Sequence, residues 1–123
     1  MIYKLKKRNI KVSLFVEPDI SDIKISKDLG ANCIEIHTGK YCNLIGNKER
    51  AKSEFSKIKK AALFAKKNLL EVHAGHGLTY TSVRQISRIS YISEFNIGHF
   101  IIAESIFIGL QRVIKKFRKI INK

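Results

Sequence analysis

The chain has 123 residues, 45% of them hydrophobic and only one a proline, which excludes a disordered, low-complexity or collagen-like protein. Its formal net charge of +14 favours anionic partners such as nucleic acid, a membrane surface or phosphorylated metabolites. The two cysteines, Cys33 and Cys42, form neither a disulfide framework nor a CxxC metal motif. Because the sequence shows no secretory signal and no apolar run of membrane-spanning length, we expect a cytoplasmic protein.

Strand-like and helix-like patterns alternate from the start of the chain. KVSLFV (11–16) predicts a strand, and the next segment (20–29) predicts a helix that ends at Gly30 as a C-cap. CIEIH (33–37) predicts a second strand, which a glycine-containing loop joins to a helix over 48–67. The apolar residues at helical spacing in these two helices are Ile20, Ile23, Ile25, Leu29, Phe55, Ile58, Ala62 and Ala65.

Two further strand and helix units follow. LLEVHA (69–74) predicts the third strand, and TSVRQISRI (81–89) predicts a short helix with Thr81 or Ser82 as its N-cap. EFNIGH (94–99) predicts the fourth strand, and a long amphipathic helix is expected over 106–120. The apolar positions of these helices are Val83, Ile86, Ile89, Ile106, Leu110, Val113, Phe117 and Ile120.

This fourfold alternation predicts an α/β fold of four βα units with parallel strands, either a small open sheet or half of an eight-stranded barrel. Ligands of such folds bind at the carboxyl ends of the strands. Three histidines, His37, His76 and His99, fall at or just after a predicted strand end, and His73 falls within the end of one. We therefore expect the four histidines to gather on the functional face.

Glu35 and His76 are the strongest candidates for chemistry. Glu35 alternates with two isoleucines, so it is expected to point away from the helices and into the mouth of a barrel, although a buried carboxylate paired to a lysine has the same pattern. His76 lies between Gly75 and Gly77, which free the backbone to turn where an ionisable imidazole is presented. His37, Thr38 and Gly39 are expected to form part of the same rim.

Four segments in this order resemble the C-terminal half of the pyridoxine 5′-phosphate synthase family: VSLFVEPD, GANCIEIHTGKYCN, VHAGHGLTY and FNIGHFIIAESIFIGL. The resemblance runs from about Ile10 to about Ile121. It implies that residues 1–123 form a single partial domain, the C-terminal half of a (β/α)8 TIM barrel without the N-terminal βα units.

The resemblance also implies an activity. Family members are transferases of vitamin B6 synthesis, which condense 1-deoxy-D-xylulose 5-phosphate with 3-amino-2-oxopropyl phosphate to pyridoxine 5′-phosphate, phosphate and water, without a metal or organic cofactor. In this sequence His76 would be the general acid and Glu35 the carboxylate that stabilises the transition state. The phosphate of the aminoketone would be bound by Gly77, Gly98 and His99.

The sequence departs from the family in two respects. The family's first half, with an NIDH segment, substrate-binding arginines and two proton acceptors, has no counterpart here, and His73 stands where the family more often has Asn. The chain is thus expected to be inactive alone and to need the missing N-terminal half or self-association. The resemblance also implies homo-oligomers, since family members form octamers.

Two other functions fit part of the sequence. A basic nucleic-acid-binding module would explain the lysine and arginine clusters at 4–11, 48–67 and 112–123, but the sequence has neither an RNP-like aromatic stretch nor a zinc finger, which makes nucleic acid an unlikely partner. A metal-dependent barrel hydrolase would use the four histidines with Glu35, but HAGH is not the HExxH motif, so we expect no metal at this site.

Overall fold

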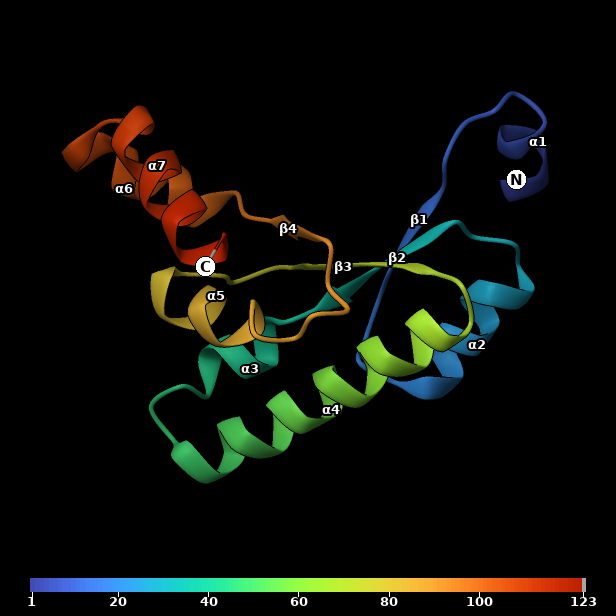
Figure 1. Ribbon diagram of the computed structural model, residues 1–123, viewed down its shortest axis with the longest axis horizontal. Coiled ribbons are helices and arrows are strands. Elements are labelled where there is room, and N and C mark those ends of the chain that lie inside the picture. Colours follow the sequence, from blue (N-terminus) through green and yellow to red (C-terminus); the bar gives the residue numbers. More distant parts are fainter. Residues whose placement is uncertain (123) are drawn as a thin grey trace.

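The computed structural model describes residues 1–122, which form one four-stranded parallel sheet and its flanking helices (Figure 1). The strands are β1 (Ser13–Val16), β2 (Cys33–His37), β3 (Glu71–Gly75) and β4 (Glu94–Asn96). The helices are α1 (Ile2–Lys6), α2 (Ile20–Asp28), α3 (Gly39–Asn43), α4 (Lys48–Lys67), α5 (Tyr80–Ile86), α6 (His99–Ile108) and α7 (Leu110–Ile121).

The strand order β1-β2-β3-β4 follows the chain, and all three neighbouring pairs are parallel. Each connection between strands therefore contains a helical crossover, as in consecutive units of a βα barrel. The predicted α/β class with four βα units is confirmed. No helix within residues 1–122 is both long and apolar enough to cross a membrane.

The two faces of the sheet differ in chemistry because side chains alternate along each strand. One face carries Ile34, Ile36, Val72 and Ala74, all at most 1% exposed, and Figure 1 shows α2 and α4 along this face. The opposite face carries the aromatic ring of Phe15 and otherwise mainly polar and small residues, several of which interact with each other. The polar and small residues are Cys33, Glu35, Glu71, His73, Gly75, Glu94 and Asn96.

Side-chain caps determine where three of the crossover helices begin. Asp19 accepts a hydrogen bond from the backbone N–H of Ser21 at the start of α2, and Asn47 caps α4 in the same way. Thr79 and Ser82 form a capping box at the start of α5. The expected caps, Thr81 and Ser82, were thus wrong, because the hydroxyl of Thr79 is the one that reaches the third backbone N–H of the helix.

The helix α2 packs on the sheet through a narrower face than its sequence predicts. Ile23 is fully buried, whereas Ile20, Ile25 and Leu29 are 43%, 56% and 57% exposed. At about 100° per residue, Ile25 and Leu29 lie on the side of the helix opposite Ile23. The predicted helix end is confirmed, since Gly30 follows the C-cap with a φ of +83°.

The C-terminal segment is two helices, not the single helix expected over 106–120. Gly109, with φ +83° and ψ +142°, separates α6 from α7. Val113, Phe117 and Ile120 are buried in a small core around Val83 of α5, as their spacing predicts. Ile106 lies before the break and is 79% exposed, so it does not share that face.

Other boundaries also differ from the prediction. β4 ends at Asn96, three residues earlier than expected, and the expected loop after β2 contains the short helix α3. The N-terminal helix α1 was not predicted, and none of its residues is buried. The early end of β4 affects the site, because α6 then begins at His99.

Candidate active site

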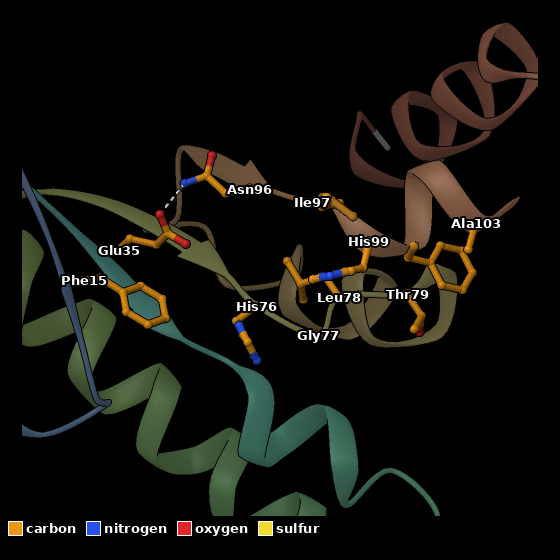
Figure 2. Close-up of a pocket in the computed structure, with 12 residues that line it drawn as sticks. Phe15, Glu35, His76, Gly77, Leu78, Thr79, Asn96, Ile97, His99 and Ala103 are labelled. Carbon is orange, nitrogen blue, oxygen red and sulfur yellow. Dashed lines mark hydrogen bonds between the residues drawn. The ribbon is translucent and has the colours of Figure 1, made fainter. Parts of the chain in front are cut away.

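A pocket of about 760 Å³ lies at the carboxyl ends of β2, β3 and β4 (Figure 2). The predicted residues Glu35, His76, Gly77, Gly98 and His99 all line it, although they come from three separate segments of the chain. The parallel register explains the gathering, because it aligns these strand ends along one edge of the sheet. The other lining residues are Phe15, Leu78, Thr79, Asn96, Ile97, Phe100 and Ala103.

The loop after β3 presents the His76 imidazole through an unusual backbone conformation. His76 and Gly77 have φ values of +75° and +74°, in the left-handed region that non-glycine residues rarely adopt. Thr38 holds this turn from the end of β2. Its hydroxyl lies 2.9 Å from the carbonyl oxygen of Gly75 and 2.8 Å from that of His76, and its backbone N–H donates to the Gly75 carbonyl at 2.8 Å.

Glu35 is held in place by a hydrogen bond, and its carboxylate fits because residue 75 has no side chain. The Asn96 amide donates to Glu35 Oε2 at 2.6 Å, as Figure 2 shows, so the partner of this carboxylate is an amide and not a lysine. A Cβ atom on Gly75 would lie only 1.9 Å from Glu35 Oε1. Glycine at position 75 therefore leaves the space that the carboxylate occupies.

His37 and Gly39 lie beside the pocket and support the His76 ring. The two imidazoles meet edge to face with centroids 4.7 Å apart, and His37 Nδ1 lies 2.6 Å from Glu17 Oε1. A Cβ atom on Gly39 would lie 2.7 Å from Cδ2 of His76 and 2.9 Å from Nε2 of His37. These residues and Thr38 pack around the His76 loop rather than lining the cavity.

The first turn of α6 forms another wall of the pocket. Gly98 is the N-cap and has no side chain to bond the free backbone N–H groups of the first turn, and His99 is the first helical residue. A Cβ atom at Gly98 would have no heavy atom within 4 Å, so the space before this helix end is open. The free N–H groups and the helix dipole make such an end suited to anions.

Cys42 lies behind the loop, next to Gly77. Its sulfur is 3.8 Å from the carbonyl oxygen of His76 and 3.9 Å from the Thr38 hydroxyl. Burial is the main cause that raises the pKa of Cys42, so this residue is a neutral thiol at neutral pH. It fills space behind the loop rather than presenting a nucleophile.

His73 does not belong to this pocket, so the expectation that all four histidines gather there is wrong. It lies in the middle of β3 and interacts with Glu71 and Glu94. Asn96 and Phe15 also line the pocket, although neither was predicted from the sequence. Period-two alternation back from Gly98 could have identified Asn96, which is the register partner of Gly75.

The fold and the pocket define a class, the βα-barrel type of α/β protein, with a polar site at the carboxyl ends of parallel strands. Residues 1–123 match the family described as "Pyridoxal phosphate biosynthesis protein PdxJ", and the chain belongs to this family.

Named relatives agree with this assignment. The chain is 50% identical over 117 residues to pyridoxine 5′-phosphate synthase of Pelagibacter ubique (strain HTCC1062), an alignment covering 95% of this chain and 49% of that protein. The chain is 49% identical to the enzyme of the same name from Sulfurihydrogenibium sp. (strain YO3AOP1), in an alignment that covers 95% of this chain and 47% of that protein. The chain is 48% identical to pyridoxine 5′-phosphate synthase of Zymomonas mobilis, in an alignment that covers 99% of this chain and 47% of that protein. The chain thus spans about half the length of the curated relatives it matches.

Proposed function

We propose that this chain provides the C-terminal half of a pyridoxine 5′-phosphate synthase active site in the cytoplasm. The reaction condenses 1-deoxy-D-xylulose 5-phosphate with 3-amino-2-oxopropyl phosphate and releases phosphate and water. The observation that carries the proposal is that Glu35, His76 and the first turn of α6 all line the same pocket. Family membership and the names of the relatives support the same assignment.

His76 acts as the general acid in this proposal. A ring closure that expels water and phosphate needs protons delivered to oxygen leaving groups, and an imidazole titrates near neutral pH. The turn at Gly77 exposes the ring to the pocket, and the neighbouring His37 ring limits its orientation. Glu35 lies on the facing wall, where a carboxylate stabilises positive charge that develops during the condensation.

The phosphate of the aminoketone binds between the His76 loop and α6. Backbone N–H groups of Gly77 and of the first turn of α6 would donate to its oxygens, and Gly98 leaves room for them. His99 adds an imidazole donor at the same end. We expect weak binding of inorganic phosphate by the chain alone, detectable by phosphorus NMR.

Catalysis requires the other half of the site. The chain spans about half of its relatives, and the outer edges of β1 and β4 have no neighbouring strand among residues 1–122. We propose that a chain carrying the N-terminal βα units, or a second copy of this chain, covers these edges.

The test is to assay pyridoxine 5′-phosphate formation by the chain alone and when it is co-expressed with the N-terminal half of the Pelagibacter ubique relative, with light scattering to give the assembled mass. Product is expected only from the combination. His76→Ala should lower its rate about 10² to 10⁴-fold, whereas Cys42→Ser should leave it nearly unchanged. Turnover by a lone monomer, or equal rates for the two variants, would contradict the proposal.

A further inference from the structure

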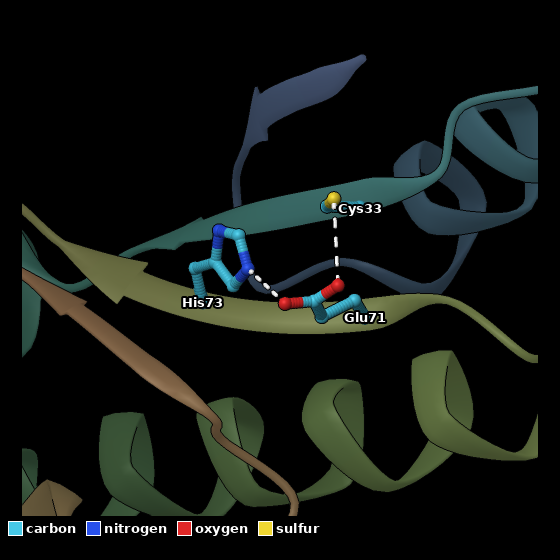
Figure 3. A group of neighbouring side chains, drawn as sticks. All are labelled: Cys33, Glu71 and His73. Atoms are coloured by element: carbon cyan, nitrogen blue, oxygen red, sulfur yellow. Dashed lines mark hydrogen bonds and ion pairs between the residues drawn. The ribbon is translucent and has the colours of Figure 1, made fainter. Parts of the chain in front are cut away.

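A second group of ionisable side chains lies on the polar face of the sheet, outside the pocket (Figure 3). Cys33 of β2 and Glu71 of β3 are register partners, and His73 follows Glu71 by two residues. A separation of two residues on a strand places both side chains on the same face. The parallel pairing of β2 with β3 therefore brings a thiol, a carboxylate and an imidazole together.

The three side chains are close together, and two of them are buried, whereas the Glu71 side chain is 38% exposed. Their potential ligand atoms all lie within 4.8 Å of one another. His73 Nε2 is 3.1 Å from Glu71 Oε1, and Cys33 Sγ is 4.0 Å from Glu71 Oε2. Cys33 and His73 are only 2% and 7% exposed.

We propose that Cys33, Glu71 and His73 bind a zinc-type divalent metal ion that ties β2 to β3. Thiolate, imidazole and carboxylate are the three protein ligands that Zn²⁺ accepts, and water can take the fourth tetrahedral position. The usual bond lengths require ligand atoms roughly 3.4 to 3.6 Å apart. The present separations of up to 4.8 Å are larger, so the side chains would have to draw together around the ion.

Glu94 completes the arrangement from the next strand. Its Oε1 lies 3.6 Å from Nδ1 of His73, the ring nitrogen that faces away from Glu71. Metal-bound histidines commonly donate their other N–H to a carboxylate, which fixes the ring and its tautomer. At 3.6 Å the Glu94 carboxylate would need to move slightly closer to accept this hydrogen bond, and His73 would then use Nε2 for the metal.

The ammonium group of Lys11 already places a positive charge next to this cluster. This group is hydrogen-bonded to Glu71 and also lies close enough to influence Cys33. A metal ion would compete with Lys11 for the same carboxylate. The cluster therefore already binds a positive charge where we place the metal, and removal of that charge should strengthen metal binding.

The proposal is tested by titrating the purified chain with Zn²⁺ in a calorimeter and with Co²⁺ in a spectrophotometer. We expect one ion per chain and a thiolate-to-cobalt charge-transfer band. Glu94→Gln should weaken binding about 10- to 100-fold, and Lys11→Met should strengthen it. Cys33→Ser and His73→Asn each remove a direct ligand and should weaken it more than Glu94→Gln does.

Cys42→Ser is the matched control, because Cys42 lies behind the His76 loop, and it should retain the parent affinity and the cobalt band. Circular dichroism of each variant, together with its thermal midpoint with and without Zn²⁺, separates loss of the ligand from loss of the fold. Equal Zn²⁺ affinity for the parent and a folded Cys33→Ser/His73→Asn double variant would overturn the proposal. Absence of Zn²⁺ binding by both the parent and Lys11→Met would overturn it too.

Discussion

The Thr38 hydroxyl lies 2.8 Å from the carbonyl oxygen of His76, the non-glycine residue of the active-site loop that has a φ of +75°. A left-handed conformation at such a residue costs about 1–3 kcal/mol and persists only where the surroundings enforce it. Thr38 is fully buried at the end of β2 and also contacts the carbonyl of Gly75. The strand that carries Glu35 thus also holds the loop that carries His76.

Thr38→Val should therefore destabilise the chain by about 1–3 kcal/mol, because it keeps the size of the side chain but removes the hydroxyl donor, and only the Gly75 carbonyl keeps a second donor, the Thr38 backbone N–H. Urea unfolding gives the free energy, and the NMR signals of the His76 ring report the loop. Thr38→Ser keeps the hydroxyl and should recover most of the loss. A Val variant as stable as the parent would show that the turn is held by other contacts.

Gly39→Ala should displace both neighbouring imidazoles. The new Cβ would lie 2.7 Å from the His76 ring and 2.9 Å from the His37 ring, closer than van der Waals contact allows. We expect a loss of about 1–3 kcal/mol and shifted ring signals of both histidines in NMR spectra.

Gly46→Ala is the matched control for this change, since a Cβ atom there meets no heavy atom within 4 Å. Its free energy of unfolding should stay within about 0.5 kcal/mol of the parent value. Unchanged His37 and His76 signals in Gly39→Ala would show that the loop can move away from the new methyl group.

The sequence predicted the parts of the fold that depend on local pattern. Alternation in CIEIH places Ile34 and Ile36 in the core and Glu35 on the other face, and the structure agrees. The break at Gly109 could not be predicted, because one glycine within an apolar helical pattern is compatible with a continuous helix.

Two contacts between strands could not be predicted from the sequence, because they depend on strand register. The cluster of Cys33, Glu71 and His73 depends on the register of β2 against β3, and a shift of one residue would turn one strand's members to the other face. The contact of Thr38 with His76 depends on the same register, since it joins the ends of both strands. Spacing along the chain places Glu71 and His73 on one face, but it does not show which residues of β2 lie opposite them.

Asn96→Asp should make stability depend on pH. The change would put a second carboxyl group next to Glu35, whose Oε2 now accepts from the Asn96 amide at 2.6 Å. Like charges raise the pKa of one group of such a pair above its unfolded value. The variant should therefore be about 1–3 kcal/mol less stable than the parent at neutral pH and should approach it as the pH falls through the raised pKa.

Thermal unfolding of the parent and of Asn96→Asp across the acid range measures how the stability difference between them decreases as the pH falls. Asn43→Asp serves as the control, because Asn43 is exposed on α3, and its difference from the parent should stay small at every pH. A gap between the parent and Asn96→Asp that does not change with pH would show that the two carboxyl groups do not interact.

Glu54 should have the opposite pH dependence. Its side chain is 9% exposed on α4, and Oε1 lies 2.8 Å from Lys57 Nζ and 3.2 Å from Lys40 Nζ. The hydrogen bond from Lys57 is the main cause that lowers the pKa of Glu54, with Lys40 adding to it and burial opposing it. A lowered pKa means that the stabilisation is fully present above the unfolded value of about 4.3 and is lost as the pH falls through the folded value.

Glu54→Gln should thus cost about 0.5–1 kcal/mol at neutral pH, a modest value because both lysines are more than half exposed. The difference from the parent should vanish at acid pH, where Glu54 is protonated and resembles glutamine. Urea unfolding at neutral and acid pH measures both values. In a double-mutant cycle, Lys57→Met should cost less in the Glu54→Gln background than in the parent, because its partner carboxylate is already gone; equal costs would mean that the pair contributes nothing.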